Sequence, residues 1–242
     1  MKWQDKGIVV SVRVLGEKNH VVHVLTHKNG LWAGVVSPTR KEGPVQPGTF
    51  VDAQWNARLE DHLGRFHLET EFVPSAYLLS DFQRLTALSS ACALIDHCAP
   101  PRESCEELYE LFHYFLKNLN GNKAWERDYI LFELCLLKLL GFGLTLTCCA
   151  VTKQTSGLTH ISPKSGHAVC QKVAQPYLSK LLVFPHLLKN FHMSYSSKHV
   201  TEALRVSGYF LQRHLFGEKK LPSARQRLED LFEKRTLTAV AI

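Results

Sequence analysis

Residues 20–36 read HVVHVLTHKNGLWAGVV, and this stretch decides the fold of the first part of the chain. Two runs rich in valine and leucine flank the pair Asn29-Gly30. An Asn-Gly pair between apolar runs is the strongest short-range signal for a β-hairpin, because both residues tolerate positive φ angles. We therefore predict a hairpin that closes through a type I′ turn at Asn29-Gly30.

Three further β-patterns surround this hairpin. The run GIVVSVRV at residues 7–14 precedes it, and apolar residues alternate again over 49–59 and 65–72. Five short strands in about 75 residues leave exposed edges if the sheet stays open, and closure into a small barrel removes them. The sequence predicts a five-stranded OB-type barrel at residues 1–75, with an SH3-like barrel as the structural alternative.

From Ala76 onward the apolar residues recur at three- and four-residue steps, which is typical of amphipathic helices. The predicted helices occupy 76–95, 104–119, 125–140, 177–182, 185–191, 197–216 and 226–234. Residues 144–176 are instead rich in turn-forming residues, with a hairpin-like excursion at 161–166. The predicted fold class is therefore α+β and multidomain, with an OB-fold barrel at 1–75 and an α-helical domain at 76–242 that carries this insertion.

The formal net charge of +7 is concentrated at one end of the chain. Residues 1–75 carry a net +1, residues 76–145 carry −3, and residues 146–242 carry +9. A basic C-terminal third favours an anionic partner, most often nucleic acid, whereas a solvated basic surface kept for solubility is the alternative. No apolar run approaches the roughly 20 residues that a membrane-spanning helix needs.

The seven cysteines are odd in number and irregularly spaced, which fits a reducing compartment better than a disulfide framework. Residues 1–6 hold Trp3 and Asp5 and lack an apolar signal core. We therefore expect a cytoplasmic protein with no membrane partner.

Candidate DNA contacts lie in both predicted domains. In the barrel, Trp32, Trp55 and Phe66 are either base-stacking platforms or core residues, and the core is the commoner fate of such residues. Cations of the barrel that can reach phosphates are Arg13, Lys28, Arg40, Lys41, Arg58 and Arg65. On the predicted helix 197–216, Lys198, Arg205 and Arg213 recur every two turns, and Lys219, Lys220, Arg225 and Arg227 extend this basic region.

Several segments in the right order together resemble the bacterial RecO family. They are Asp5-Lys6-Gly7-Ile8-Val9, Gly16-Glu17, Thr26–Gly30, Gln46-Pro47-Gly48 with Val51 and Trp55, Leu139–Leu144, Ser162–Gly166, Ser207–Leu211 and Leu221–Arg225. The resemblance implies an OB fold, a helical domain and a zinc module inserted into it. It also implies binding to single- and double-stranded DNA, strand annealing, cooperation with RecR, and engagement of the acidic C-terminal tail of single-strand-binding protein during recombinase loading.

The zinc module is where the sequence departs from that family. Metal-binding members carry two Cys-x-x-Cys pairs, the thiolate spacing of a structural tetrahedral site. Here the pairs read Cys149…Thr152 and Cys170…Val173, so two of the four sulfurs are missing. His160 and His167 lie between them, but their spacing is not that of a standard finger. We expect no cofactor and no bound zinc.

We find no Gly-x-Ser-x-Gly motif, and the thirteen histidines are scattered. The resemblance therefore implies a non-enzymatic DNA-binding mediator of recombinational repair, and the residues offer no catalytic motif against it. A protein-interaction adaptor is the alternative, in which the near-neutral barrel docks a protein partner rather than DNA. Salt-dependent binding to a plain oligonucleotide distinguishes the two.

Overall fold

The computed structural model describes residues 1–37, 45–59, 62–191 and 194–240. The chain divides into two compact units. The first comprises residues 1–125 and 222–228, and the second comprises 126–221 and 229–242. Within the described ranges, every helix is too short or too polar to cross a bilayer.

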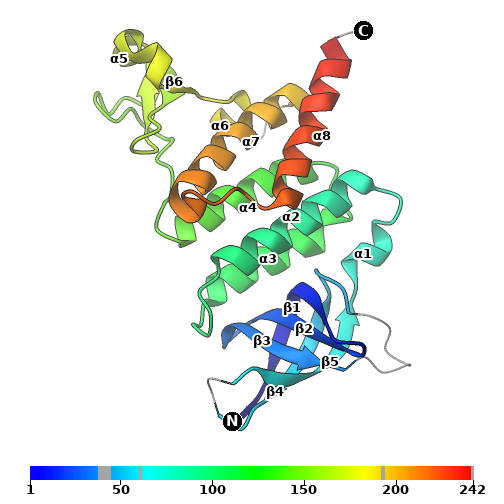
Figure 1. Cartoon of the computed structure of the whole chain (residues 1–242). Helices are drawn as coiled ribbons and strands as arrows, with labels where there is room; N and C mark the ends of the chain where they lie inside the picture. The colour runs from blue at the N-terminus through cyan, green and yellow to red at the C-terminus, as the bar shows by residue number, and fades with distance from the viewer. Residues whose placement is uncertain (38–44, 60–61, 192–193, 241–242) are drawn as a thin grey trace. The chain divides into compact units, whose positions relative to one another are not determined.

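The first unit begins with a closed barrel whose strand order is β1-β2-β3-β5-β4 (Figure 1). The strands are β1 (Lys2–Leu15), β2 (Asn19–Thr26), β3 (Gly30–Val36), β4 (Phe50–Asn56) and β5 (Gly64–Phe72). β1 pairs with both β2 and β4, and a short parallel pairing of β3 with β5 closes the ring. The expected OB-type barrel is therefore confirmed, and closure pairs every barrel strand on both sides.

The hairpin at residues 20–36 is confirmed, but its turn differs from the expected type. Thr26 pairs with Gly30, so three residues form the loop. Gly30 has a positive φ of 78°, whereas Asn29 does not. The left-handed glycine is the first residue of β3, directly after the three loop residues, so the turn is not the type I′ turn, which needs positive φ at both central residues. The Thr26 hydroxyl stabilises it by donating to the Gly30 carbonyl at 2.8 Å and accepting from the Asn29 amide at 3.2 Å.

The helix expected over 76–95 is interrupted. α1 (Pro74–Tyr77) ends after one turn and α2 (Phe82–Cys98) starts afresh, because the Asp81 carboxylate caps it by accepting from the Arg84 amide at 3.0 Å. Leu79 continues the three- and four-residue apolar spacing, yet it is 78% exposed in the connection. α3 (Glu106–Leu119) matches the expected helix closely.

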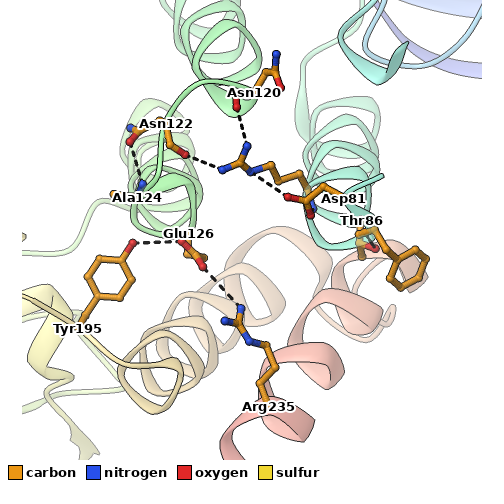
Figure 2. Close-up of polar contacts among 10 residues, drawn as sticks. Asp81, Thr86, Asn120, Asn122, Ala124, Glu126, Tyr195 and Arg235 are labelled. Atoms are coloured by element: carbon orange, nitrogen blue, oxygen red, sulfur yellow. Dashed lines mark hydrogen bonds and ion pairs between the residues drawn. The ribbon is translucent and has the colours of Figure 1, made fainter. Parts of the chain in front are cut away.

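One guanidinium holds the turn after α3. Arg84 Nη1 donates to the Asn120 carbonyl at 2.6 Å, and Nη2 donates to the Asn122 carbonyl at 3.0 Å (Figure 2). Its Nε lies 3.3 Å from Asp81 Oδ2. A charged side chain at the start of α2 therefore fixes the connection that leads to α4.

The barrel packs against α2 and α3 through polar contacts at its surface. His23 Nδ1 lies 2.5 Å from Asp96 Oδ1, and Arg13 Nη2 lies 3.5 Å from the other oxygen of the same carboxylate. His27 Nε2 lies 3.3 Å from Glu110 Oε1. These contacts tie β1 and β2 to the first two long helices of this unit.

The main helices of the second unit are α4 (Trp125–Leu139) from residue 126 on, α6 (His186–Lys189), α7 (Ser197–Leu211) and the part of α8 (Ser223–Val240) that follows Leu228. Its interior holds a buried carboxylate, Glu133, which accepts hydrogen bonds from the Tyr129 hydroxyl at 2.8 Å and the Ser207 hydroxyl at 2.5 Å. Two helix boundaries differ from expectation. The last turn of the expected helix 197–216 is a π-helix, Gln212–Phe216, and α8 is longer than the expected 226–234.

The insertion folds as a small three-stranded sheet of order β7-β6-β8. β6 (Leu158–Ile161) and β7 (Ala168–Cys170) form the expected hairpin around residues 162–167. α5 (Gln171–Ala174) and a 3-10 helix (Gln175–Lys180) follow, and β8 (Leu182–Val183) returns to the sheet. The helix expected at 177–182 is therefore this 3-10 helix, which begins and ends two residues earlier.

Candidate nucleic-acid interface

The three barrel aromatics considered as stacking platforms are core residues. Trp55 is 0% exposed, and Trp32 and Phe66 are also buried in the barrel core. The Trp55 indole donates to the Ala33 carbonyl at 3.1 Å, and that of Trp32 donates to the Asn29 carbonyl at 2.7 Å. The platform interpretation is therefore wrong, because a closed five-stranded barrel needs bulky side chains to fill its interior.

Two of the candidate barrel cations face outward at the same level of the barrel. Arg13 pairs with Val21, Val21 with Val35, and Val35 with Arg65 across four successive strands. Directly paired residues point to the same side of a sheet, and both arginines are exposed. Three strand spacings of roughly 4.8 Å separate the arginines along the sheet by about 14 Å. The Asp96 carboxylate offsets part of the Arg13 charge.

The other barrel candidates do not all join this pair. Arg58 is exposed two residues beyond Asn56, the partner of Arg65, so it lies near that end of the barrel. Lys28 is exposed in the β2–β3 turn at the opposite end of β3. Its amide and the Asn29 side chain both donate to the Asp5 carboxylate, at 2.7 and 3.0 Å. Arg40 and Lys41 lie outside the described residues.

The basic candidates of the last long helix are exposed but partly neutralised. Arg205 Nε and Nη2 both donate to Glu233 Oε1, at 3.1 and 2.8 Å. Arg213 lies in the π-helical turn and donates to the Tyr209 hydroxyl at 3.2 Å. Lys198 is exposed near the start of α7. A shared DNA-contacting face formed by Lys198, Arg205 and Arg213 stays a prediction. The π-helical turn makes the spacing of these residues less regular. The Glu233 carboxylate offsets part of the Arg205 charge.

The extension of that basic region needs one correction. Arg225 is 0% exposed, so its guanidinium cannot reach a phosphate in solvent. Lys219, Lys220 and Arg227 are exposed, as expected. The basic region beyond α7 therefore rests on these three residues.

A cavity of about 520 Å³ opens in the second unit beside the start of α7. Glu126 lines it, accepting a hydrogen bond from the Tyr195 hydroxyl at 3.2 Å and lying 3.7 Å from Arg235 Nη1 (Figure 2). Burial and the nearby Glu126 charge raise the pKa of Tyr195 to about 12. Lys198 adds a second cation to the wall of the cavity, and Val200 and Phe232 contribute apolar surface to it.

The four degenerate zinc positions converge. Thr152 Oγ1 lies 3.8 Å from Cys170 Sγ, and the Cys170 amide donates to Cys149 Sγ at 3.4 Å. Val173 packs against the buried cluster that contains both cysteines. Although burial opposes it, hydrogen bonds from the Thr152 side chain and from backbone amides lower the pKa of Cys149 to about 6.

This donor set does not fit a structural zinc ion. Two thiols, a hydroxyl and an isopropyl group cannot supply four ligands. The His160 ring lies 2.9 Å from the Thr159 hydroxyl rather than on a sulfur. Within the described ranges, no three His, Cys, Asp or Glu side chains are close enough to share a metal ion. The absence of zinc stays a prediction for elemental analysis.

Sequence reasoning missed one group of cations. Lys153, Lys164, Lys172 and Lys180 of the insertion are all exposed. The signal that could have found them is the absence of acidic residues, because residues 134–201 contain neither aspartate nor glutamate. A count of net charge over the whole C-terminal third hides this pattern.

Comparison with known proteins assigns the family. The family model described as "Recombination protein O N terminal" matches residues 1–71, and the one described as "Recombination protein O C terminal" matches residues 79–223. The chain belongs to the RecO family. Proteins named DNA repair protein RecO are 35% identical in Bartonella tribocorum, over 97% of both chains, and 37% identical in Roseobacter denitrificans, over 97% of this chain and 100% of that one. The RecO protein of Rhodospirillum rubrum is 37% identical over 94% of both chains.

The structure explains part of the family resemblance. Two of the segments that carry it, around Asp5 and around Thr26–Gly30, meet at the β2–β3 turn. The Asp5 carboxylate of β1 thereby fixes the turn that joins β2 to β3.

Proposed function

We propose that this RecO-family chain is a non-enzymatic mediator of recombinational repair. It binds single- and double-stranded DNA, anneals complementary strands, and helps recombinase load onto strands coated by single-strand-binding protein. RecR and the acidic tail of single-strand-binding protein are its protein partners. The observation that carries the proposal is the match to both RecO models over residues 1–71 and 79–223.

The charge distribution supports DNA as the ligand. Arg13 and Arg65 face outward at one level of the barrel, and the C-terminal third carries a net +9. Exposed cations bind phosphates without a large desolvation cost, and each one releases counterions from the strand. Binding of this kind is insensitive to sequence, which suits a protein that anneals any complementary pair.

One observation favours the adaptor as a second candidate. Trp32, Trp55 and Phe66 are buried, so the barrel presents none of them for base stacking. The barrel also has a net charge of only +1. In this alternative the barrel docks a protein partner and does not contact DNA.

The test measures binding of a fluorescein-labelled 30-nucleotide oligo-dT at several salt concentrations, together with the rate of annealing of two complementary strands. Mediator function predicts that log affinity falls linearly with log salt and that annealing accelerates. Changing Arg13 and Arg65 to glutamine should make the slope shallower by about 1.4, or roughly 0.7 for each lost contact. The matched control changes Lys117 and Lys123 to glutamine and should leave the slope unchanged. Both lysines lie in residues 76–145, which carry a net charge of −3.

One result would decide against the mediator, and another would change only the role of the barrel. Wild-type protein that neither binds the strand nor accelerates annealing would rule out the mediator. Normal DNA binding by the Arg13/Arg65 variant would instead leave the mediator standing and assign the barrel to a protein partner.

A further inference from the structure

The insertion lies in a long stretch without acidic residues. Residues 134–201 hold seven lysines and no aspartate or glutamate. At the frequency of the whole chain, 22 in 242, about six acidic residues would be expected there. A solvated surface kept for solubility normally intersperses both signs of charge, so this one-sided composition favours an anionic ligand.

The fold brings two of these lysines onto neighbouring turns. Lys153 follows Thr152 directly, and Lys172 lies two residues after Cys170 at the start of α5. Because Thr152 Oγ1 is 3.8 Å from Cys170 Sγ, the two turns are in contact. Lys180 ends the 3-10 helix that continues from α5. In the described ranges, no ion pair involves any of these three lysines, and all three are exposed.

Lys153 occupies a strained backbone conformation. Its φ is +61°, in the left-handed region that favours glycine. A residue with a Cβ in this region costs free energy relative to glycine, and such strain tends to persist at functional sites. Glycine would adopt this conformation without that cost, so the lysine side chain here carries a backbone penalty.

An aromatic side chain is exposed between the last two lysines. Tyr177 is 55% exposed within the 3-10 helix, between Lys172 and Lys180. Its backbone leaves the helical region, with φ −127° and ψ 15°. Exposed aromatics interleaved with cations are the arrangement that proteins use to bind single strands, stacking bases while the cations contact phosphates.

We propose that residues 144–183, which comprise the insertion and continue through the 3-10 helix and β8, form a metal-free binding module for single-stranded DNA. Lys153, Lys172 and Lys180 contact the phosphates, and Tyr177 stacks on a base. The module rests on the proposed DNA-binding function and assigns part of that binding to a site other than the barrel and α7. The Thr152–Cys170 contact takes over the task of the missing metal by holding the two turns together.

The first experiment compares two triple variants by salt titration with the 30-nucleotide oligo-dT. The module variant changes Lys153, Lys172 and Lys180 to glutamine, and it should make the log–log slope shallower by about 2. At 0.1 M salt this corresponds to an affinity about 100-fold lower, taking 1 M as the point where the charge contribution vanishes. The control variant changes three exposed lysines outside the module to glutamine and should bind like wild type. They are Lys117, Lys123 and Lys138.

The second experiment separates lost contacts from lost folding. Lys153→Gly relieves the left-handed strain, so its midpoint of thermal unfolding should rise by about 2–4 °C. The same variant should lower affinity for oligo-dT about fivefold at 0.1 M salt, because one phosphate contact is gone. Tyr177→Ala should weaken binding about tenfold, and Tyr177→Phe should restore it because the ring still stacks.

Each outcome supports or overturns the module. A shallower slope in the module triple but not in the control, with weaker binding by a more stable Lys153→Gly, supports it. Wild-type slopes in the module triple overturn it while leaving the proposed function intact. The module triple could instead lose binding to a labelled peptide of alternating aspartate and glycine while its DNA binding is unchanged. That result would also overturn the module, because it would identify an acidic protein segment as the ligand. Wild-type protein that binds no DNA would refute the proposed function and the module together.

Discussion

Changing Thr152 and Val173 to cysteine is expected to turn the insertion into a zinc site. In a tetrahedral site with Zn–S bonds of about 2.3 Å, neighbouring sulfurs lie about 3.8 Å apart. The Thr152 hydroxyl already lies 3.8 Å from Cys170 Sγ, and Val173 packs against the cluster of Cys149 and Cys170. The two new thiols would therefore complete four converging ligands without a change of backbone.

The expected magnitude follows from ligand linkage. Zinc in thousandfold excess over its dissociation constant stabilises the folded state by about 4 kcal/mol. For a chain of this length, each kcal/mol raises the unfolding midpoint by about 2–4 °C, so zinc should raise that of the double variant by about 8–16 °C. Without zinc, the smaller side chain at position 173 should cost about 1 kcal/mol.

Elemental analysis after dialysis, followed by thermal unfolding with and without a chelator, is the assay. The double variant should retain one zinc per chain, and wild-type protein should retain none. Adding Cys149→Ser to the double variant should abolish tight binding, since a closed site needs all four ligands. A double variant that stays metal-free would show that the four positions do not converge, and one zinc in wild-type protein would show that two thiols suffice.

Three further predictions concern binding and stability. Changing Arg40 and Lys41 together to alanine should weaken binding to all DNA sequences alike and make the log–log salt slope shallower by about one to two. An unchanged slope would exclude these two residues from the DNA path. Charge reversal at Arg205 and Arg213 should lower DNA affinity while binding of an acidic tail peptide persists. Lost peptide binding with intact DNA binding would instead assign these two arginines to the protein partner. Trp55→Ala should lower the free energy of unfolding by about 3–5 kcal/mol in denaturant titrations, because the side chain is 0% exposed; a loss below about 1 kcal/mol would contradict its place in the core.

Much of the fold follows from the sequence because local periodicity reports backbone conformation directly. The valine-rich alternation around Asn29-Gly30 is sufficient for a hairpin, and five such strands in about 75 residues require closure. The insertion's hairpin and the helices at 106–119 and 125–139 follow in the same way. The connection at 78–81 was missed because the capping carboxylate of Asp81 outweighs an apolar spacing that continues across it.

The candidate site is less accessible to sequence reasoning, because function depends on which side chains meet and which are buried. Alternation identifies the two faces of a strand, but only closure of the barrel placed Trp32 and Trp55 inside. A basic count included Arg225, whose burial depends on packing that spacing does not report.

The sequence by itself determined the barrel, the succession of helices, the family and the loss of two zinc ligands. Each of these depends on local pattern or on the order of motifs along the chain. Only the tertiary structure decided that Cys149, Thr152, Cys170 and Val173 still converge, and that Lys153 and Lys172 lie on the turns they join. Contacts between residues about twenty positions apart arise when two turns pack together, and no pattern within either turn encodes that meeting.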